Sequence, residues 1–147
     1  KPNAITVSAI IHAPLSTVWD SWTNPAHITH WAFASTDWEA PHADNDVRVG
    51  GRFLTRMAAK DKSAGFDFTG TYTAVKKHEL IEYAMDKAPH ESESRQVMIS
   101  FAEVRGGVQV TETFDLENQN AAEMQRAGWQ AILDNFKKYT ESRSYHQ

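Results

Sequence analysis

Residues 123–139 read EMQRAGWQAILDNFKKY, and this stretch decides the fold that the sequence predicts. Its side chains form one stripe at helical spacing, made of Met124, Gly128, Ala131, Ile132, Asn135, Phe136 and Tyr139. A stripe of this width is typical of an amphipathic helix that covers a sheet. Asn120, followed three residues later by Glu123, has the pattern of a capping box, so we expect one long helix from Asn120 to Glu141.

Gly128 and Trp129 lie side by side in the middle of this helix. Glycine inside a helix costs roughly 1 kcal/mol relative to alanine. We therefore expect Gly128 to mark the closest approach of the helix to the sheet, where Gly128→Leu would cost roughly 1–3 kcal/mol through overpacking. Trp129 has two interpretations: ordinary core packing, or the lining of a space between the helix and a curved sheet.

The N-terminal third predicts a strand, two short helices and a loop. Residues 4–12 alternate between apolar and polar side chains, as a half-buried strand does. Pro14 suits the first turn of a helix, and Asn24, followed by a proline, suits the N-cap of a second short helix that reaches Trp31. Residues 33–45 have little periodicity, and we expect a long loop there.

From residue 46 onward the pattern predicts strands joined by short turns. Period-two alternation between turn residues places strands at 47–49, 52–59, 66–75, 80–86, 95–104 and 108–116. With the helices, this order predicts an α+β fold in which a strongly curved antiparallel sheet packs one face against the long helix. The space between helix and sheet is the usual place for an apolar pocket.

Length and composition favour one globular domain. A chain of 147 residues can bury an ordinary core, so we expect a single domain over residues 1–147. The formal net charge of −4 gives no general attraction to nucleic acid, and no apolar run is long enough to span a membrane. Cysteine is absent, which excludes disulfides and thiolate metal sites. We expect a cytoplasmic protein without a nucleic-acid partner.

Several short patterns together resemble one protein family. They are Trp22-Thr23-Asn24-Pro25 with Trp31, then DVRVGGRF at 46–53, GTY at 70–72, LIEY at 80–83 and Gly128-Trp129. In this order they resemble the activator of heat shock protein 90 ATPase homologue family, within the START-like (SRPBCC) superfamily. The resemblance implies a helix-grip fold with a cavity between the sheet and the C-terminal helix, and a link to the stress response. It implies no particular reaction, because the superfamily includes lipid carriers, polyketide cyclases and co-chaperone domains.

Strand parity and the family resemblance select a set of ligand-binding candidates. The set consists of residues expected to face the long helix, together with aromatic residues of the helices: Trp31, Phe53, Met57, Phe68, Tyr72, Tyr83, Met85, Glu112, Phe114 and Trp129. Core packing explains any one of these aromatic residues equally well.

Glu112 is the unusual member, because it lies between Val110 and Phe114 on the inward parity. A carboxylate buried there needs a partner, with Arg52 or Arg56 as candidates, or else burial raises its pKa. A β-bulge that turns Glu112 outward explains the pattern equally well.

Other kinds of site have little support. His27 and His30 could share a helix face, but no third metal ligand is marked by spacing, so we expect no metal. No Gly-x-Ser-x-Gly elbow is present, and the glycine pairs precede strands rather than helices, which argues against a catalytic triad and a phosphate loop. We expect no cofactor and propose no catalytic residue.

Three functions remain. The first is binding of a hydrophobic or aromatic small molecule, which the inward aromatic residues favour. The second is a cyclase-like or aromatase-like enzyme with Glu112 and Tyr72 or Tyr83 as acid and base, which only the residue types support. The third is a chaperone-binding module, ranked last because the chain has no room for the additional N-terminal domain of the namesake co-chaperones. The sequence does not decide between a monomer and a homodimer.

Overall fold

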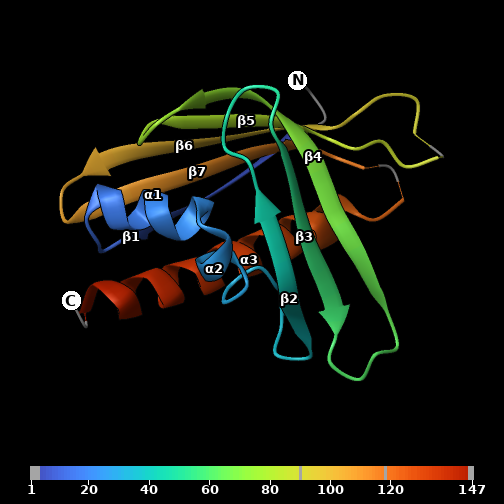
Figure 1. Cartoon of the computed structure of the whole chain (residues 1–147), viewed down its shortest axis with the longest axis horizontal. Helices are drawn as coiled ribbons and strands as arrows, with labels where there is room; N and C mark the ends of the chain where they lie inside the picture. Colours follow the sequence, from blue (N-terminus) through green and yellow to red (C-terminus); the bar gives the residue numbers. More distant parts are fainter. Residues whose placement is uncertain (1–3, 90, 118, 146–147) are drawn as a thin grey trace.

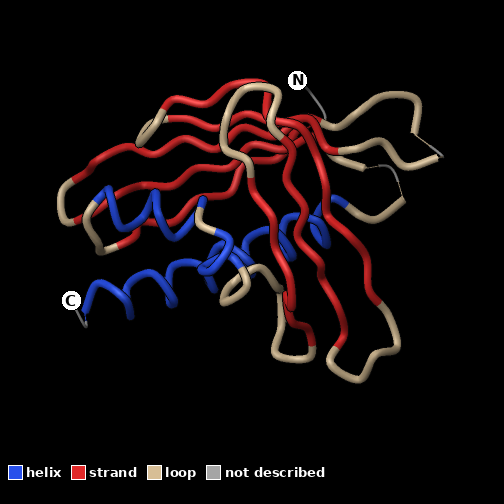
Figure 2. The backbone as a smooth tube through the Cα atoms, viewed as in Figure 1, coloured by secondary structure: helices blue, strands red, loops and turns tan. Residues whose placement is uncertain are grey.

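The computed structural model describes residues 4–89, 91–117 and 119–145. Strands and helices follow the order β1 (Ala4–Ile11), α1 (Leu15–Thr23), α2 (Pro25–Ile28), β2 (Trp38–Asn45), β3 (Arg52–Ala59), β4 (Gly65–Lys76), β5 (Leu80–Met85), β6 (Gln96–Val104), β7 (Gly107–Asp115) and α3 (Ala122–Tyr145). The strands form one seven-stranded sheet of order β1-β7-β6-β5-β4-β3-β2, and every neighbouring pair is antiparallel. Figures 1 and 2 show this sheet curving around α3, which is the helix-grip arrangement that the sequence predicts.

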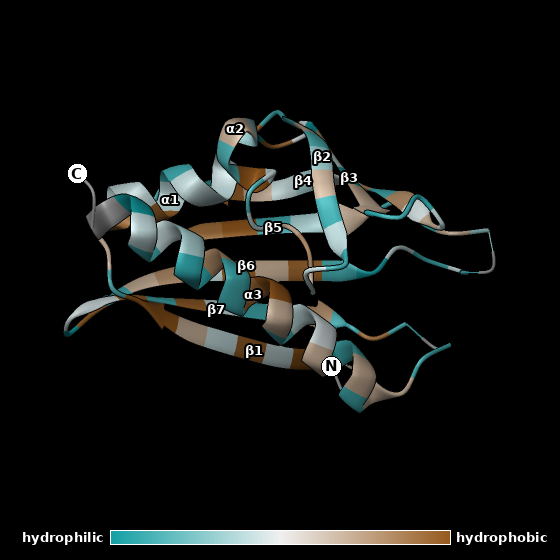
Figure 3. Ribbon diagram, turned by 90° about the horizontal axis from the view of Figure 1, so that it is seen from below, coloured by the Kyte–Doolittle hydropathy of each residue, from teal (hydrophilic) through white to brown (hydrophobic). Residues whose placement is uncertain are grey.

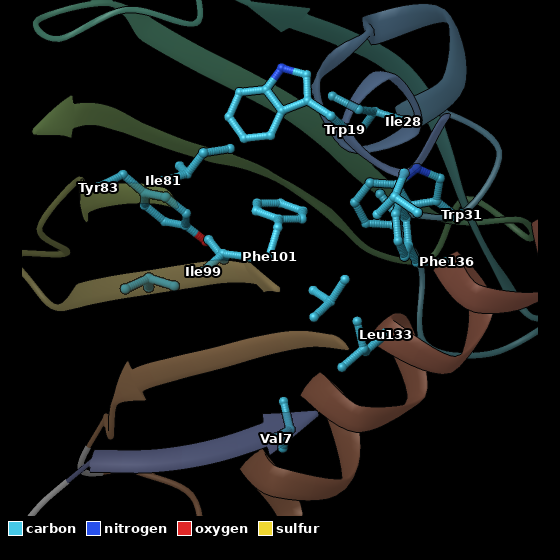
Figure 4. Close-up of a cluster of buried hydrophobic side chains, with 14 of the residues drawn as sticks. Val7, Trp19, Ile28, Trp31, Ile81, Tyr83, Ile99, Phe101, Leu133 and Phe136 are labelled. Carbon is cyan, nitrogen blue, oxygen red and sulfur yellow. The ribbon is translucent and has the colours of Figure 1, made fainter. Parts of the chain in front are cut away.

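All three helices lie on the concave side of the sheet, as the view from below in Figure 3 shows. On α3, the residues that pack inward most completely are Leu133, Phe136 and Thr140, none of which is accessible to solvent. Figure 4 shows Leu133 and Phe136 facing the core, where the Phe136 ring lies 4.9 Å from that of Trp31. Burial of this helix face is the main apolar contribution that α3 makes to stability.

The edge strand β1 is covered by long polar side chains of α3. Arg126 Nη1 donates a hydrogen bond to the carbonyl of Thr6 at 3.1 Å, and Lys137 Nζ donates to that of Ile10 at 2.5 Å. Edge carbonyls are otherwise free to pair with another chain. The helix therefore shields this side of the sheet as well as packing on it.

Three expectations about α3 are wrong. The helix begins at Ala122 and ends at Tyr145, and the Asn120 amide donates to Glu117 Oε2 at 3.0 Å rather than capping the helix. A Cβ atom at Gly128 would have no neighbour within 4 Å, so Gly128 is not a point of close approach. Met124 is 64% exposed and does not belong to the buried stripe.

Two expectations about the strands also fail. Residues 38–45 form the edge strand β2 instead of a loop, with a shift in register between Glu39 and His42. Residues 47–49 lie in the turn between β2 and β3, where Val49 is 63% exposed.

The start of the fold agrees better with the sequence. Asn24 caps α2 by accepting a hydrogen bond from the amide of Ala26 at 3.0 Å, with Pro25 at the first helical position. Pro14 is the N-cap of α1, and α2 ends at Ile28, three residues before Trp31.

Candidate functional site

A cavity of about 320 Å³ lies between the sheet and the helices. Its wall comes from α1 and α2, from the strands β2 to β5 and β7, and from α3, together with residues next to these elements. Asp44 and Phe66 belong to the wall and are themselves exposed, so the cavity opens to solvent near β2 and β4. A cavity of this size is at the lower end of the range for small-molecule sites.

Nine of the ten candidate residues line this cavity. They are Trp31, Phe53, Met57, Phe68, Tyr72, Tyr83, Met85, Glu112 and Trp129. The tenth, Phe114, is fully buried behind the wall, where its ring stacks on that of Trp129 with centroids 4.1 Å apart. Phe114 therefore orients Trp129 instead of facing the cavity.

Phe53 is the centre of the aromatic wall. Its ring centroid lies 4.8 Å from that of Tyr83, 5.3 Å from that of Tyr72 and 5.4 Å from that of Phe68. Gly70, which pairs with Phe53, makes room for this ring, because a Cβ atom there would come within 2.7 Å of the Phe53 ring. The inward parity of β3, β4 and β5 thus builds one continuous aromatic surface.

Tyr72 is held in place by a chain of hydrogen bonds. Its hydroxyl donates to Asn45 Oδ1, and Asn45 Nδ2 donates to the carbonyl of Thr23 at 2.7 Å. Burial is the main reason that the pKa of Tyr72 is raised. Its hydroxyl is therefore a satisfied structural group that links β4 to the edge strand β2 and to the end of α1.

Glu112 faces the interior and is 5% exposed. The pairing of β7 with β1 is regular through Glu112 and Val7, so no β-bulge turns the side chain outward. Among the residues that the structure describes, no hydrogen bond or ion pair reaches the Glu112 carboxyl group. Burial alone raises its pKa to about 8.

The two arginines considered as partners for Glu112 are engaged elsewhere, so that alternative is wrong, and the other alternative, a pKa raised by burial, holds. Arg52 Nη1 donates to Asp86 Oδ1 at 2.8 Å, and Arg56 Nη1 lies 3.4 Å from Asp67 Oδ1. The arginine on the cavity wall is Arg95, whose Nε donates to Glu91 Oε2 at 2.9 Å.

His27 and His30 lie outside the cavity wall, beside the C-terminal half of α3. His27 Nδ1 and the Tyr139 hydroxyl are 2.5 Å apart, and the His30 ring stacks on Tyr139. His27 Nε2 also lies 3.3 Å from Asp20 Oδ2. Within the described part of the chain, no group of three or more side chains has the arrangement of a metal site.

The candidate set left out several residues of the wall, namely Trp22, Ile28, Ala32, Asp44, Asn45, Thr55, Phe66, Arg95, Glu117, Gln125 and Ile132. Two of these residues could have been included from the sequence: Thr55 has the same strand parity as Phe53, and Ile132 belongs to the apolar stripe of the long helix. Asp44 and Asn45 fell in the expected loop, so no face could be assigned to them.

The family model described as "Activator of Hsp90 ATPase homolog 1-like protein" matches residues 12–141. The chain belongs to this family. The solution structure of the AHSA1-like protein from Aeromonas hydrophila is 44% identical, with a TM-score of 0.86 over 95% of this chain and 93% of that one. A protein from Cytophaga hutchinsonii is also 44% identical, with a TM-score of 0.78 over 99% and 96% of the two chains.

A more distant protein from Chromobacterium violaceum shares the fold, with 20% identity and a TM-score of 0.84 over 96% of this chain and 99% of that one. No curated protein matches this member of the Hsp90 ATPase activator-like family. In the described residues, no helix is long and apolar enough to cross a membrane.

Proposed function

We propose that the protein binds a small apolar or aromatic molecule in the cavity between α3 and the sheet. The observation that carries this proposal is the cavity itself, about 320 Å³ in volume and walled largely by aromatic side chains. Small-molecule sites are typically concave, mostly apolar pockets of about 300–1,000 Å³, so a cavity of this size and lining favours a ligand site.

The proposed contacts follow from the wall. Phe53, Phe68 and Tyr83 offer ring faces and edges from the sheet, while Trp129 and Trp31 approach from the helical side. Aromatic walls favour flat ligands, because offset and edge-to-face ring contacts add to the burial of apolar area. Tyr72, Met57, Met85 and Glu112 complete the proposed contact set.

Binding of the neutral fluorescent probe N-phenyl-1-naphthylamine tests the proposal. We expect saturable binding at micromolar probe concentrations, with quenching of tryptophan emission, because three of the five tryptophans line the cavity. Thr55→Phe fills the cavity from a residue that is 6% exposed, and should weaken binding by roughly tenfold or more.

Thr111→Phe is the matched control, since Thr111 lies on the opposite face of β7 and outside the cavity wall. This variant should bind the probe as the unmodified protein does. Equal binding by all three folded proteins, or no binding by any of them, would contradict the proposal.

The alternatives become testable in the same experiment. For the cyclase-like enzyme, the hydroxyl of Tyr72 is already engaged with Asn45, which leaves Glu112 and Tyr83 as the acid and base. For the chaperone-binding module, the support is the family description. Failure of the probe to bind would place the chaperone-binding module first.

A further inference from the structure

Two polar groups on the cavity wall lack a partner in the described part of the chain: the Glu112 carboxyl and the Tyr83 hydroxyl. Both residues are more than nine-tenths buried, with exposures of 5% and 7%. Buried polar groups in native proteins are almost always hydrogen-bonded, and leaving one unpaired costs roughly 1–3 kcal/mol. Because the cavity opens to solvent, water can pair with these two groups while the cavity is empty, and a ligand that displaces this water must supply a polar atom in its place.

The sheet register puts the two groups on the same inward face, two strands apart and in adjacent inward rows. Ile99 of β6 pairs with Glu112 of β7, while Tyr83 of β5 pairs with the neighbouring Val97 of β6. Figure 4 shows the Tyr83 side chain pointing from β5 toward β6. The negative charge of an ionised Glu112 also contributes to the raised pKa of Tyr83, after burial, which is consistent with their proximity.

The groups around Glu112 decide whether its carboxyl is protonated, and so a hydrogen-bond donor, or ionised at neutral pH. Titratable or charged neighbours on the cavity wall are Tyr72 from β4, Tyr83 from β5, Arg95 before β6, Glu117 after β7 and Asp44 from β2. Strand β1 presents Val7 and α3 presents Trp129 and Gln125, none of which titrates. Arg95 is paired with Glu91. With no cation bonded to it, Glu112 keeps its proton at neutral pH, since its pKa is about 8.

A protonated carboxyl and a phenol are both hydrogen-bond donors. We propose that the ligand is an uncharged aromatic carbonyl compound whose oxygen accepts hydrogen bonds from the Glu112 carboxyl and the Tyr83 hydroxyl. Its apolar body lies against Phe53 and Trp129. This proposal rests on the proposed function and adds the chemical class of the ligand.

Three probes with the same ring system separate the two proposals: naphthalene, 2-acetylnaphthalene and 2-(aminomethyl)naphthalene. Their affinities are measured at pH 7 by displacement of N-phenyl-1-naphthylamine. We expect the ketone to bind roughly tenfold more tightly than naphthalene, which corresponds to one or two net hydrogen bonds. The ammonium probe should bind more weakly than either.

Variants of Glu112 and Tyr83 test which of the two donors makes the ketone bind more tightly than naphthalene. Glu112→Gln keeps a donor and should preserve the preference for the ketone from pH 6 to pH 9. In the unmodified protein the preference should fall between pH 7 and pH 9, as Glu112 loses its proton. Tyr83→Phe removes only a hydroxyl and should reduce the preference at every pH, which gives a second test if a Glu112 variant fails to fold.

Equal binding of naphthalene and 2-acetylnaphthalene would overturn this inference while leaving the proposed function intact. Tighter binding of the ammonium probe, lost in Glu112→Gln, would overturn it by showing that Glu112 binds as an anion. Binding of none of the three probes would overturn both proposals.

Discussion

Glu112→Gln should change how the stability of the protein depends on pH. In the folded protein the pKa of Glu112 is raised from 4.5 to about 8 by burial. In the unfolded chain the carboxyl ionises near its ordinary pKa, so folding between these two values takes up one proton. Protonated Glu112 therefore supports the fold fully below pH 4.5, and this support is lost as the pH rises to about 8.

The size of the effect follows from the two pKa values. The difference between 8 and 4.5 is 3.5 pH units, and each unit corresponds to about 1.4 kcal/mol, so the full loss is about 5 kcal/mol. Small domains are stable by about 5–15 kcal/mol in total, so the loss is easily measured. Glutamine has the same shape and does not ionise, so Glu112→Gln should not show this loss.

The assay is urea unfolding followed by tryptophan fluorescence, at pH values from 5 to 9. We expect the free energy of unfolding of the variant, relative to that of the unmodified protein, to rise by about 1.4 kcal/mol per pH unit up to about pH 8. Above about pH 8 this difference should stay constant. Glu103→Gln, at an exposed carboxyl on β6, is the control and should not reproduce this pH profile. A difference between Glu112→Gln and the unmodified protein that is constant from pH 5 to pH 8 would refute a buried, unpaired carboxyl.

Three further predictions concern the helices. Gly128→Ala should raise the free energy of unfolding by roughly 1 kcal/mol, because the added methyl group meets open space in a helix interior. A lower free energy of unfolding in urea would instead indicate that the helix closely contacts a neighbour at this residue. Burial, followed by the charge of Arg143, lowers the pKa of His27 below 6.5, so stability should fall as the pH drops below 6.5, and His27→Gln should flatten that part of the profile. Trp31→Phe should cost roughly 1–3 kcal/mol, because it leaves the buried Ser21 carbonyl without the 2.9 Å hydrogen bond from Trp31 Nε1; unchanged unfolding would argue against that bond.

Much of the fold was predictable because the central strands obey simple alternation. In β7, Val108, Val110, Glu112 and Phe114 are buried and the residues between them are not, so parity alone gave the inward face. The same rule put Phe53, Tyr72 and Tyr83 on the cavity side. Family resemblance supplied the relation of the sheet to the last helix.

The edge strand β2 could not be recognised in this way. Its sequence, WEAPHADN, includes a proline and the titratable residues Glu39, His42 and Asp44. Edge strands often carry such residues, which prevent pairing with other chains. Pro41 falls where the register shifts between Glu39 and His42, a position where the missing amide hydrogen is tolerated. Because this strand was not predicted, the hydrogen bond from the Tyr72 hydroxyl to Asn45 could not be predicted either.

The helix was predicted in kind but not in its exact orientation. Gly128 looked like a contact point, yet the buried face runs through Leu133, Phe136 and Thr140. This rotation also lets Arg126 and Lys137 reach the carbonyls of β1. Such hydrogen bonds depend on the tertiary position of an edge strand, which periodicity within the helix does not contain.

The most direct test of the central claim is an NMR titration of isotope-labelled protein with naphthalene. We expect saturable shifts of the backbone amides of Thr55 and Tyr83 and of the indole N–H of Trp129, because all three residues lie on the cavity wall. In Thr55→Phe, saturating the shifts at Tyr83 and Trp129 should take roughly tenfold more naphthalene or beyond. Unchanged signals at these three residues, or shifts confined to the outer face around Met98 and Thr111, would contradict a ligand site between α3 and the sheet.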